Sequence, residues 1–140
     1  MSAKNGFSHQ HCIRVLNNGN YLIYDNGNLH GVKSPPPINQ IRKKVVINDD
    51  YERTEPLESR AVEYKVDEKA KTAELVWEYS EGVFGVGMGS VQRLKNGNTL
   101  IGWGKASVCL TEVDSVGNKV LEMSLPEEFY TNHVFKCTIK

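Results

Sequence analysis

Arg14-Val15-Leu16-Asn17-Asn18-Gly19-Asn20-Tyr21-Leu22-Ile23 is a stretch that the chain uses twice, because it returns as Arg93-Leu94-Lys95-Asn96-Gly97-Asn98-Thr99-Leu100-Ile101. In both copies an Asn-Gly pair has apolar residues on either side. Glycine adopts the positive φ that primed two-residue turns require, and such turns join neighbouring antiparallel strands. Each copy therefore predicts a β-hairpin with its Asn-Gly pair in the turn.

A second hairpin is expected behind each of these. After the first copy, strand patterns at 61–67 and 72–79 flank a polar connection, and after the second copy 108–114 and 119–125 flank a short turn. The alternation in Val62-Glu63-Tyr64-Lys65-Val66 is typical of a half-buried strand. The sequence thus predicts an all-β protein with two four-stranded antiparallel meanders, and a repeated four-stranded meander is a propeller blade.

The distance between the two copies is too long for one blade of roughly 40–50 residues. The excess is a polar, proline-rich insertion at 29–59, which contains Pro35-Pro36-Pro37 and one short apolar run at 44–47. Without the insertion the spacing is that of one blade. The expected organisation of this single partial domain is blade one at 7–80, blade two at 88–126 and an overhanging C-terminal strand at 132–140.

Two blades alone would leave large apolar faces in water, because blades cover one another around a ring. We therefore expect the chain to be a fragment of a larger β-propeller whose missing blades complete the ring. A ring closed by self-association and a face-to-face sandwich of the two sheets are the alternatives.

Composition excludes several classes of function. The 140 residues include 39% hydrophobic residues, and Lys+Arg and Asp+Glu each number 17, so no excess of positive charge is present to bind nucleic acid. No apolar run approaches the roughly 20 residues of a membrane helix, and the first residues lack the apolar core of a secretory signal. Cys12, Cys109 and Cys137 are odd in number and far apart, which favours free thiols, although one disulfide between distant strands stays open.

Three stretches in order resemble the bacterial arylsulfate sulfotransferases: Phe7-Ser8-His9-Gln10-His11, Ile23-Tyr24-Asp25-Asn26-Gly27-Asn28, and 59–67 with 75–79. The resemblance covers most of the chain and implies the C-terminal part of a propeller of about six blades. It further implies transfer of a sulfuryl group from a phenolic sulfate ester to a phenol through a sulfated histidine, without a cofactor. It places the nucleophile at His11 and the parent protein in the periplasm or otherwise outside the cytoplasm.

The chemistry of the residues is compatible with that transfer. A neutral imidazole is nucleophilic near pH 7 and can take the sulfuryl group before a second oxygen does. His9 precedes His11 by two positions, so in a strand both rings would share a face. The candidate substrate-binding residues are His9, Asn26 and Arg60, with Arg14 as a further polar candidate.

Other interpretations stay open at this point. His11 can be an ordinary strand histidine, and His9 with His11 can supply two ligands of a zinc site that needs two more. A noncatalytic propeller module that binds a protein or glycan partner is the alternative function. The family's other charge-stabilising residues lie on blades that this chain does not contain, so we expect the isolated chain to be inactive.

Overall fold

The computed structural model describes residues 7–33 and 52–137. These residues form two four-stranded antiparallel sheets, with strand orders β1-β2-β3-β4 and β5-β6-β7-β8, and they contain no helix. The predicted all-β class and the two meanders are therefore confirmed. The strands are β1 (His11–Val15), β2 (Tyr21–Asp25), β3 (Arg60–Asp67), β4 (Thr72–Tyr79), β5 (Ser90–Arg93), β6 (Thr99–Gly102), β7 (Val108–Val113) and β8 (Lys119–Ser124).

The repeated Asn-Gly hairpins are present, but their turns are not the primed type that we expected. In the first hairpin the Gly19 N–H donates to the Leu16 carbonyl and the Leu16 N–H donates to Asn20. Gly19 has a φ of 83° while Asn18 keeps a negative φ, so a type I turn is followed by one left-handed glycine. The same two hydrogen bonds recur between Leu94 and Asn98.

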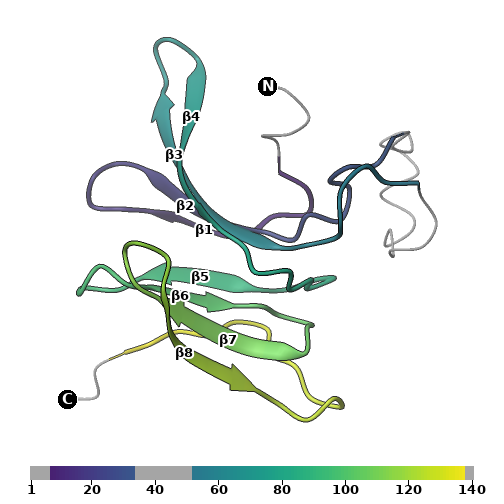
Figure 1. Cartoon of the computed structure of the whole chain (residues 1–140). Helices are drawn as coiled ribbons and strands as arrows, with labels where there is room; N and C mark the ends of the chain where they lie inside the picture. Colours follow the sequence, from purple (N-terminus) through teal and green to yellow (C-terminus); the bar gives the residue numbers. More distant parts are fainter. Residues whose placement is uncertain (1–6, 34–51, 138–140) are drawn as a thin grey trace.

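The two sheets lie one above the other, and the end of the β3–β4 hairpin projects away from the second sheet (Figure 1). Side chains from both sheets form the core between them. Trp103 is fully buried there, and its ring meets Tyr24 edge to face at 6.2 Å. The buried members of this core are Leu22, Tyr24, Ala61, Val91, Ile101, Trp103 and Val113.

Glycines in the connection between the sheets allow this close contact. A Cβ on Gly89 would lie 2.1 Å from the Tyr24 ring, and Gly89 has a φ of 103°. A Cβ on Gly85 would lie 2.0 Å from the Trp103 carbonyl oxygen. The chain between β4 and β5 can therefore pass directly over the core only because these positions lack side chains.

In each sheet the third strand carries a buried glutamate at the same register, and each glutamate joins its sheet to the segment that follows it. Glu63 lies opposite Leu22 and accepts hydrogen bonds from Asn20 at 2.6 Å and from Arg93 of β5 at 2.9 Å. We call this set the Glu63 bridge. The second asparagine of each Asn-Gly-Asn loop is thus fixed to the third strand of its own sheet.

The Glu112 bridge is the equivalent set in the second sheet. Glu112 lies opposite Leu100 and accepts from Asn98 at 2.8 Å and from Lys136 at 2.9 Å. Lys136 therefore holds the C-terminal segment against the second sheet in the way that Arg93 holds β5 against the first.

The expected C-terminal strand is not a strand within the residues described. The segment 132–137 runs beside β5, but side chains rather than a backbone ladder hold it there. Ser90 Oγ accepts from the Val134 N–H at 2.8 Å, and Gln92 Oε1 accepts from the Lys136 N–H at 2.8 Å. The backbone of this segment thus has no strand partner among the described residues. The end of the expected strand, 138–140, and the apolar run at 44–47 lie outside them.

The structure also bears on the cysteines and on membrane-spanning helices. All three cysteines are free: Cys109 is buried, Cys12 is half-buried and Cys137 is exposed. In the described parts of the chain, no helix is long and apolar enough to cross a bilayer.

From the Glu112 bridge we predict that the free energy of unfolding decreases at acidic pH. Hydrogen bonds from Lys136 and Asn98 hold the pKa of Glu112 below its ordinary value of 4.5, although burial opposes them. The contribution of the Glu112 carboxylate to stability is then fully present above pH 4.5 and is lost as the pH falls through the lowered pKa. Glu112→Gln should reduce the free energy of unfolding at pH 7 by about 2 kcal/mol, and the difference from wild type should shrink in acid.

Urea unfolding at several pH values measures this effect. Glu122→Gln is the matched control, because Glu122 pairs with Lys119 on the exposed strand β8 and should cost about 0–1 kcal/mol. Equal losses in the two variants at pH 7, or a Glu112→Gln loss that persists unchanged in acid, would refute the role of the bridge.

Candidate functional site

His11, the first residue of β1, has one ring nitrogen fixed by two acceptors. Its Nδ1 lies 2.5 Å from Asn26 Oδ1 and 2.9 Å from the His9 carbonyl oxygen. Both neighbours accept hydrogen bonds, so Nδ1 carries the proton in the neutral ring. The lone pair is then on Nε2, which makes no hydrogen bond to any residue in 7–33 or 52–137.

The orientation of Asn26 is itself determined by its neighbours. Its Nδ2 donates to the Gly85 carbonyl at 2.6 Å and to the Met88 carbonyl at 3.1 Å. An amide with its NH2 group on two carbonyls must direct its oxygen the other way, which here is toward His11. Asn26 is fully buried and all these contacts are internal. The side chain therefore connects the candidate nucleophile to the glycine-rich segment between the sheets.

His9 lies near His11 but not for the reason that the sequence suggested. The strand begins at His11, and His9 is in a bend with a φ of 60°. The expectation that two positions along a strand bring the rings together was therefore wrong. The bend arises because Ser8 is bonded to distant groups: its N–H donates to Asp25 Oδ1 at 2.8 Å and its hydroxyl accepts from the Leu29 N–H at 2.9 Å.

The His9 ring is electrostatically coupled to His11. Burial lowers the pKa of His9 below 6.5, a charge on His11 lowers it further, and the charge of Asp25 acts in the opposite direction. His9 is therefore neutral at pH 7. Its Nδ1 lies 3.0 Å from Ser8 Oγ.

Arg60 belongs to a different cluster, centred on Asp25. The Arg60 Nε donates to Asp25 Oδ2 at 3.1 Å, the Arg60 guanidinium also pairs with Glu78 at 3.1 Å, and His30 Nε2 lies 3.2 Å from Asp25 Oδ2. Burial would raise the pKa of Asp25, but hydrogen bonds from His30 and Ser8 and the charges of His30 and Arg60 outweigh it and keep the pKa low. The structure thus joins Asn26 to His11 and places Arg60 elsewhere.

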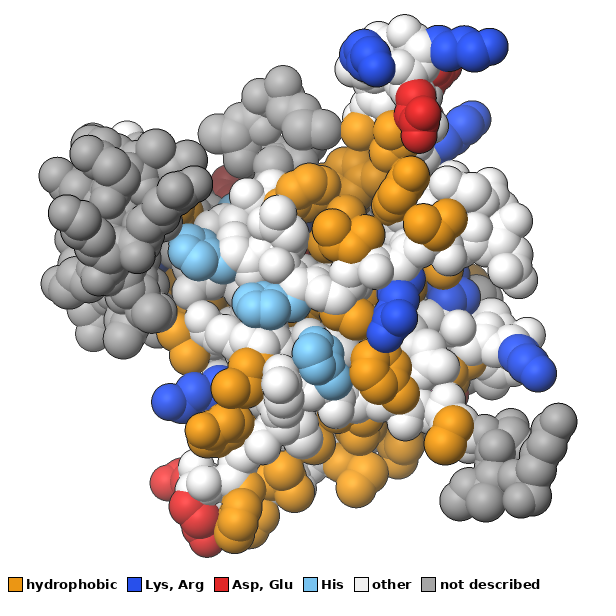
Figure 2. Space-filling model, turned by 180° about the vertical axis from the view of Figure 1, so that it is seen from behind, with side chains coloured by type: hydrophobic (Ala, Val, Ile, Leu, Met, Phe, Trp, Pro, Cys, Tyr) orange, Lys and Arg blue, Asp and Glu red, His pale blue; other side chains and the backbone are white. Residues whose placement is uncertain are grey.

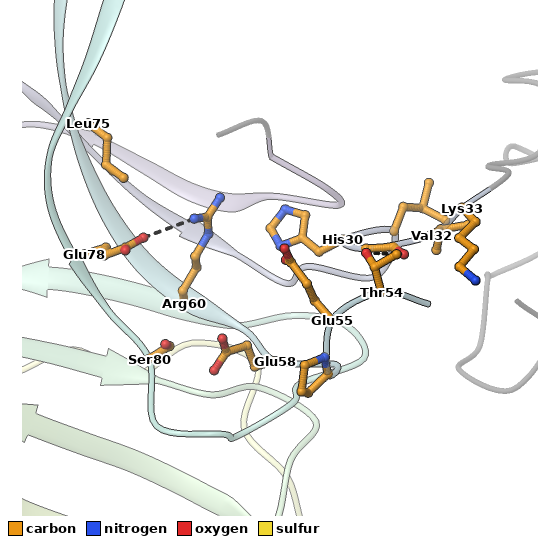
Figure 3. A pocket seen from close by; sticks show the side chains of 13 residues that line it. His30, Val32, Lys33, Thr54, Glu55, Glu58, Arg60, Leu75, Glu78 and Ser80 are labelled. Carbon is orange, nitrogen blue, oxygen red and sulfur yellow. Dashed lines mark hydrogen bonds and ion pairs between the residues drawn. The ribbon is translucent and has the colours of Figure 1, made fainter. Parts of the chain in front are cut away.

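A cavity of about 830 Å³ adjoins the Asp25 cluster. Arg60 and His30 contribute to its wall, and the ion pair of Arg60 with Glu78 closes one side (Figure 3). Neither His9, His11 nor Asn26 lines it. The cavity is therefore separate from the candidate nucleophile.

On the face seen in Figure 2, histidine side chains lie in a row across the middle of the molecule. Hydrophobic and Lys or Arg side chains adjoin one end of this row. Within residues 7–33 and 52–137, no three or more His, Cys, Asp or Glu side chains are grouped to hold a metal ion. The chemistry that the site can offer is that of an imidazole nucleophile beside a second, neutral imidazole.

Sequence reasoning did not identify the two carbonyls that orient Asn26. The glycines of 82–90 were the available signal, since they mark close approach of the backbone to another group. Asp25 was likewise missed, because its partners come from separate parts of the chain.

Comparison with known proteins gives one family. The family model described as Arylsulfotransferase (ASST) matches residues 2–136, almost the whole chain. A search of curated proteins gives no significant match.

The geometry around His11 predicts its tautomer. In the neutral ring we expect the proton on Nδ1, which ¹⁵N chemical shifts of labelled histidine report directly. Asn26→Ala removes one of the two acceptors and should shift the population toward the Nε2–H form that a free imidazole prefers in water. It should also cost about 2 kcal/mol of stability, because the carbonyls of Gly85 and Met88 each lose a hydrogen bond from the buried amide.

Asn28→Ala is the matched control. Asn28 is also fully buried and donates to the Val86 carbonyl at 3.0 Å, but it has no contact with His11. This variant should lose stability and keep the wild-type tautomer. A wild-type His11 protonated on Nε2, or equal tautomer shifts in both variants, would show that Asn26 does not control the ring.

Proposed function

The chain belongs to the arylsulfotransferase family, and from this we propose that His11 is the residue that carries a sulfuryl group between a phenolic sulfate ester and a phenol. The observation that supports the proposal most directly is the pair of acceptors on His11 Nδ1, at 2.5 and 2.9 Å. In the neutral ring they leave the Nε2 lone pair available for attack.

The transfer proceeds in two displacements. In the first, Nε2 attacks the sulfur of the aryl sulfate, an N–S bond forms, the S–O bond to the ring breaks, and its electron pair leaves with the phenolate. In the second, the oxygen of the acceptor phenol attacks sulfur, the N–S bond breaks and its electrons return to Nε2. The proton given up by the acceptor balances the one taken by the departing phenolate.

Asn26 acts as a positioning residue in this scheme. When Nε2 bears the sulfuryl group, the ring is positively charged and its Nδ1–H becomes a stronger donor. Asn26 Oδ1 and the His9 carbonyl are already placed to accept it. Preorganised acceptors of this kind stabilise the intermediate without any rearrangement at the moment of reaction.

His9 is suited to donate a hydrogen bond to the substrate. Ser8 Oγ accepts from Leu29, which leaves its own proton for His9 Nδ1 and places the ring proton of His9 on Nε2. A neutral N–H donor beside His11 can then bind a sulfate oxygen on which negative charge grows. Arg60 was a further candidate for substrate contact, but both its carboxylate partners favour a structural role at the separate cavity.

We also propose that the two sheets are blades of a larger propeller, with the bounds 7–80 and 88–126. The Glu112 bridge supports this, because it holds 132–136 against the second sheet as the Glu63 bridge holds β5 against the first. The outer parts of the second sheet support it as well, since they expose apolar side chains that a next blade would cover. Those side chains are Val120, Leu121, Met123, Leu125, Phe129 and Tyr130.

Two consequences follow for the whole protein. Growing charge on the leaving oxygen and the sulfate oxygens requires several donors around the nucleophile, and we expect further blades to supply part of them, so the isolated 140 residues should not turn over. The protein with its complete ring of blades acts on aryl sulfates and phenols and uses no cofactor. As in the family, that protein works in the periplasm or otherwise outside the cytoplasm.

This function is tested by the detection of a covalent sulfuryl adduct on the protein. The protein with its complete set of blades, incubated with 4-nitrophenyl sulfate, should gain the mass of one SO3 group, and peptide mapping should locate it on His11. His11→Ala should abolish both the adduct and the transfer. His30→Asn, which alters the histidine of the separate cavity, should keep them.

Full activity of His11→Ala without any adduct would refute the enzyme assignment and favour a noncatalytic binding module. Turnover by the 140-residue chain alone would contradict only the need for further blades.

A further inference from the structure

We infer that Arg14, Phe135 and His133 form a subsite that binds the aromatic ring and the negative charge of an aryl anion beside His11. This inference rests on the proposed function for its biological meaning. It is carried by contacts between the first strand and the C-terminal segment, which join Arg14, already a polar candidate from the sequence, to His133 and Phe135, which had no assigned role.

The first observation is an exposed stack of rings. His133 and Phe135 are nearly parallel, with centroids 5.9 Å apart and an angle of 19° between planes. Phe135 is 47% exposed, so the stack still offers apolar surface to a ligand. Aromatic side chains left at a surface in this arrangement provide a platform on which a further ring can stack.

The second observation is the cation on that stack. The Arg14 guanidinium carbon lies 4.9 Å from the centroid of the Phe135 ring. In the described ranges Arg60 and Arg93 pair with carboxylates and Arg53 donates to two carbonyls, whereas Arg14 has no carboxylate partner. Its donors are thus available to a sulfate or phenolate oxygen.

The third observation relates this cluster to His11. In β1, His11 lies opposite Tyr24 and Arg14 lies opposite Leu22, on either side of a bulge. Directly opposed residues of antiparallel strands share a face, and Tyr24 and Leu22 both point into the core between the sheets. His11 and Arg14 therefore project from the same face of β1.

The C-terminal segment is held in place independently of the stack. The Ser90 side chain binds the backbone N–H of Val134, and the Gln92 side chain binds the backbone N–H of Lys136. Val134 packs on the second sheet and Lys136 pairs with Glu112. Phe135 alternates with them and contacts Arg14 through its ring, and His133 stacks on Phe135. The platform is thus positioned by contacts that a change at Phe135 does not remove.

Benzenesulfonate is the probe, because it has the ring and the anionic group of an aryl sulfate but no transferable S–O link to the ring. Titrated into the ¹⁵N-labelled 140-residue protein, it should shift the resonances of Arg14 Nε–H and the amides of 133–136. Phe135→Leu should weaken its binding about fivefold, the effect expected for loss of one aromatic pair. Methanesulfonate, which lacks the ring, should bind equally to wild type and Phe135→Leu.

Phe129→Leu is the matched control, because Phe129 is an exposed aromatic residue outside the stack and its loss should leave the binding unchanged. Arg14→Gln should weaken both sulfonates. Shifts confined to the residues around the 830 Å³ cavity, or wild-type affinity of Phe135→Leu, would overturn the subsite.

Failure of the subsite and failure of the proposed function are distinguishable. Binding at the stack without a sulfuryl adduct on His11 in the complete protein refutes the function alone. An adduct on His11 with unchanged sulfonate binding by Phe135→Leu refutes the subsite alone.

Discussion

The site depends on one buried amide. Asn26 uses its NH2 group on the carbonyls of Gly85 and Met88 and its oxygen on His11 Nδ1, so a single side chain connects the end of β2, the link between the sheets and the candidate nucleophile. An amide has a donor end and an acceptor end, and reversing it would oppose donors to donors and carbonyls to carbonyls. The backbone path of the link therefore determines which nitrogen of the neutral His11 ring carries the proton and which carries the lone pair.

That path depends in turn on how the sheets pack. The link can approach Asn26 because Gly85 and Gly89 lie against Trp103 and Tyr24 without side chains of their own. The Glu63 bridge sets the sheets side by side from the opposite end of the strands, through Asn20 and Arg93. Its counterpart at Glu112 places the segment that bears Phe135 and His133. A buried glutamate paired with a cationic side chain thus holds β5 against the first sheet and the C-terminal segment against the second.

The sequence predicted what is local and missed what is brought together by packing. The hairpins were predictable because Asn-Gly loops and alternating apolar residues act within a few positions. The turn type was not, because Asn18 keeps a negative φ and only Gly19 is left-handed. The resemblance suggested His11, but the bend at His9 depends on the bonds of Ser8 to Asp25 and Leu29, far along the chain. No periodicity could reveal that Asn26 contacts residues some sixty positions away, at Gly85 and Met88.

The most direct measurement of the central claim is the position of the sulfuryl group on the ring of His11. In the complete protein, labelled with ¹⁵N-histidine and trapped with donor in the absence of acceptor, heteronuclear NMR distinguishes a sulfated Nε2 from a sulfated Nδ1. We expect SO3 on Nε2 and a protonated Nδ1 that is still bonded to Asn26. A sulfuryl group on Nδ1, or on any residue other than His11, would contradict the account.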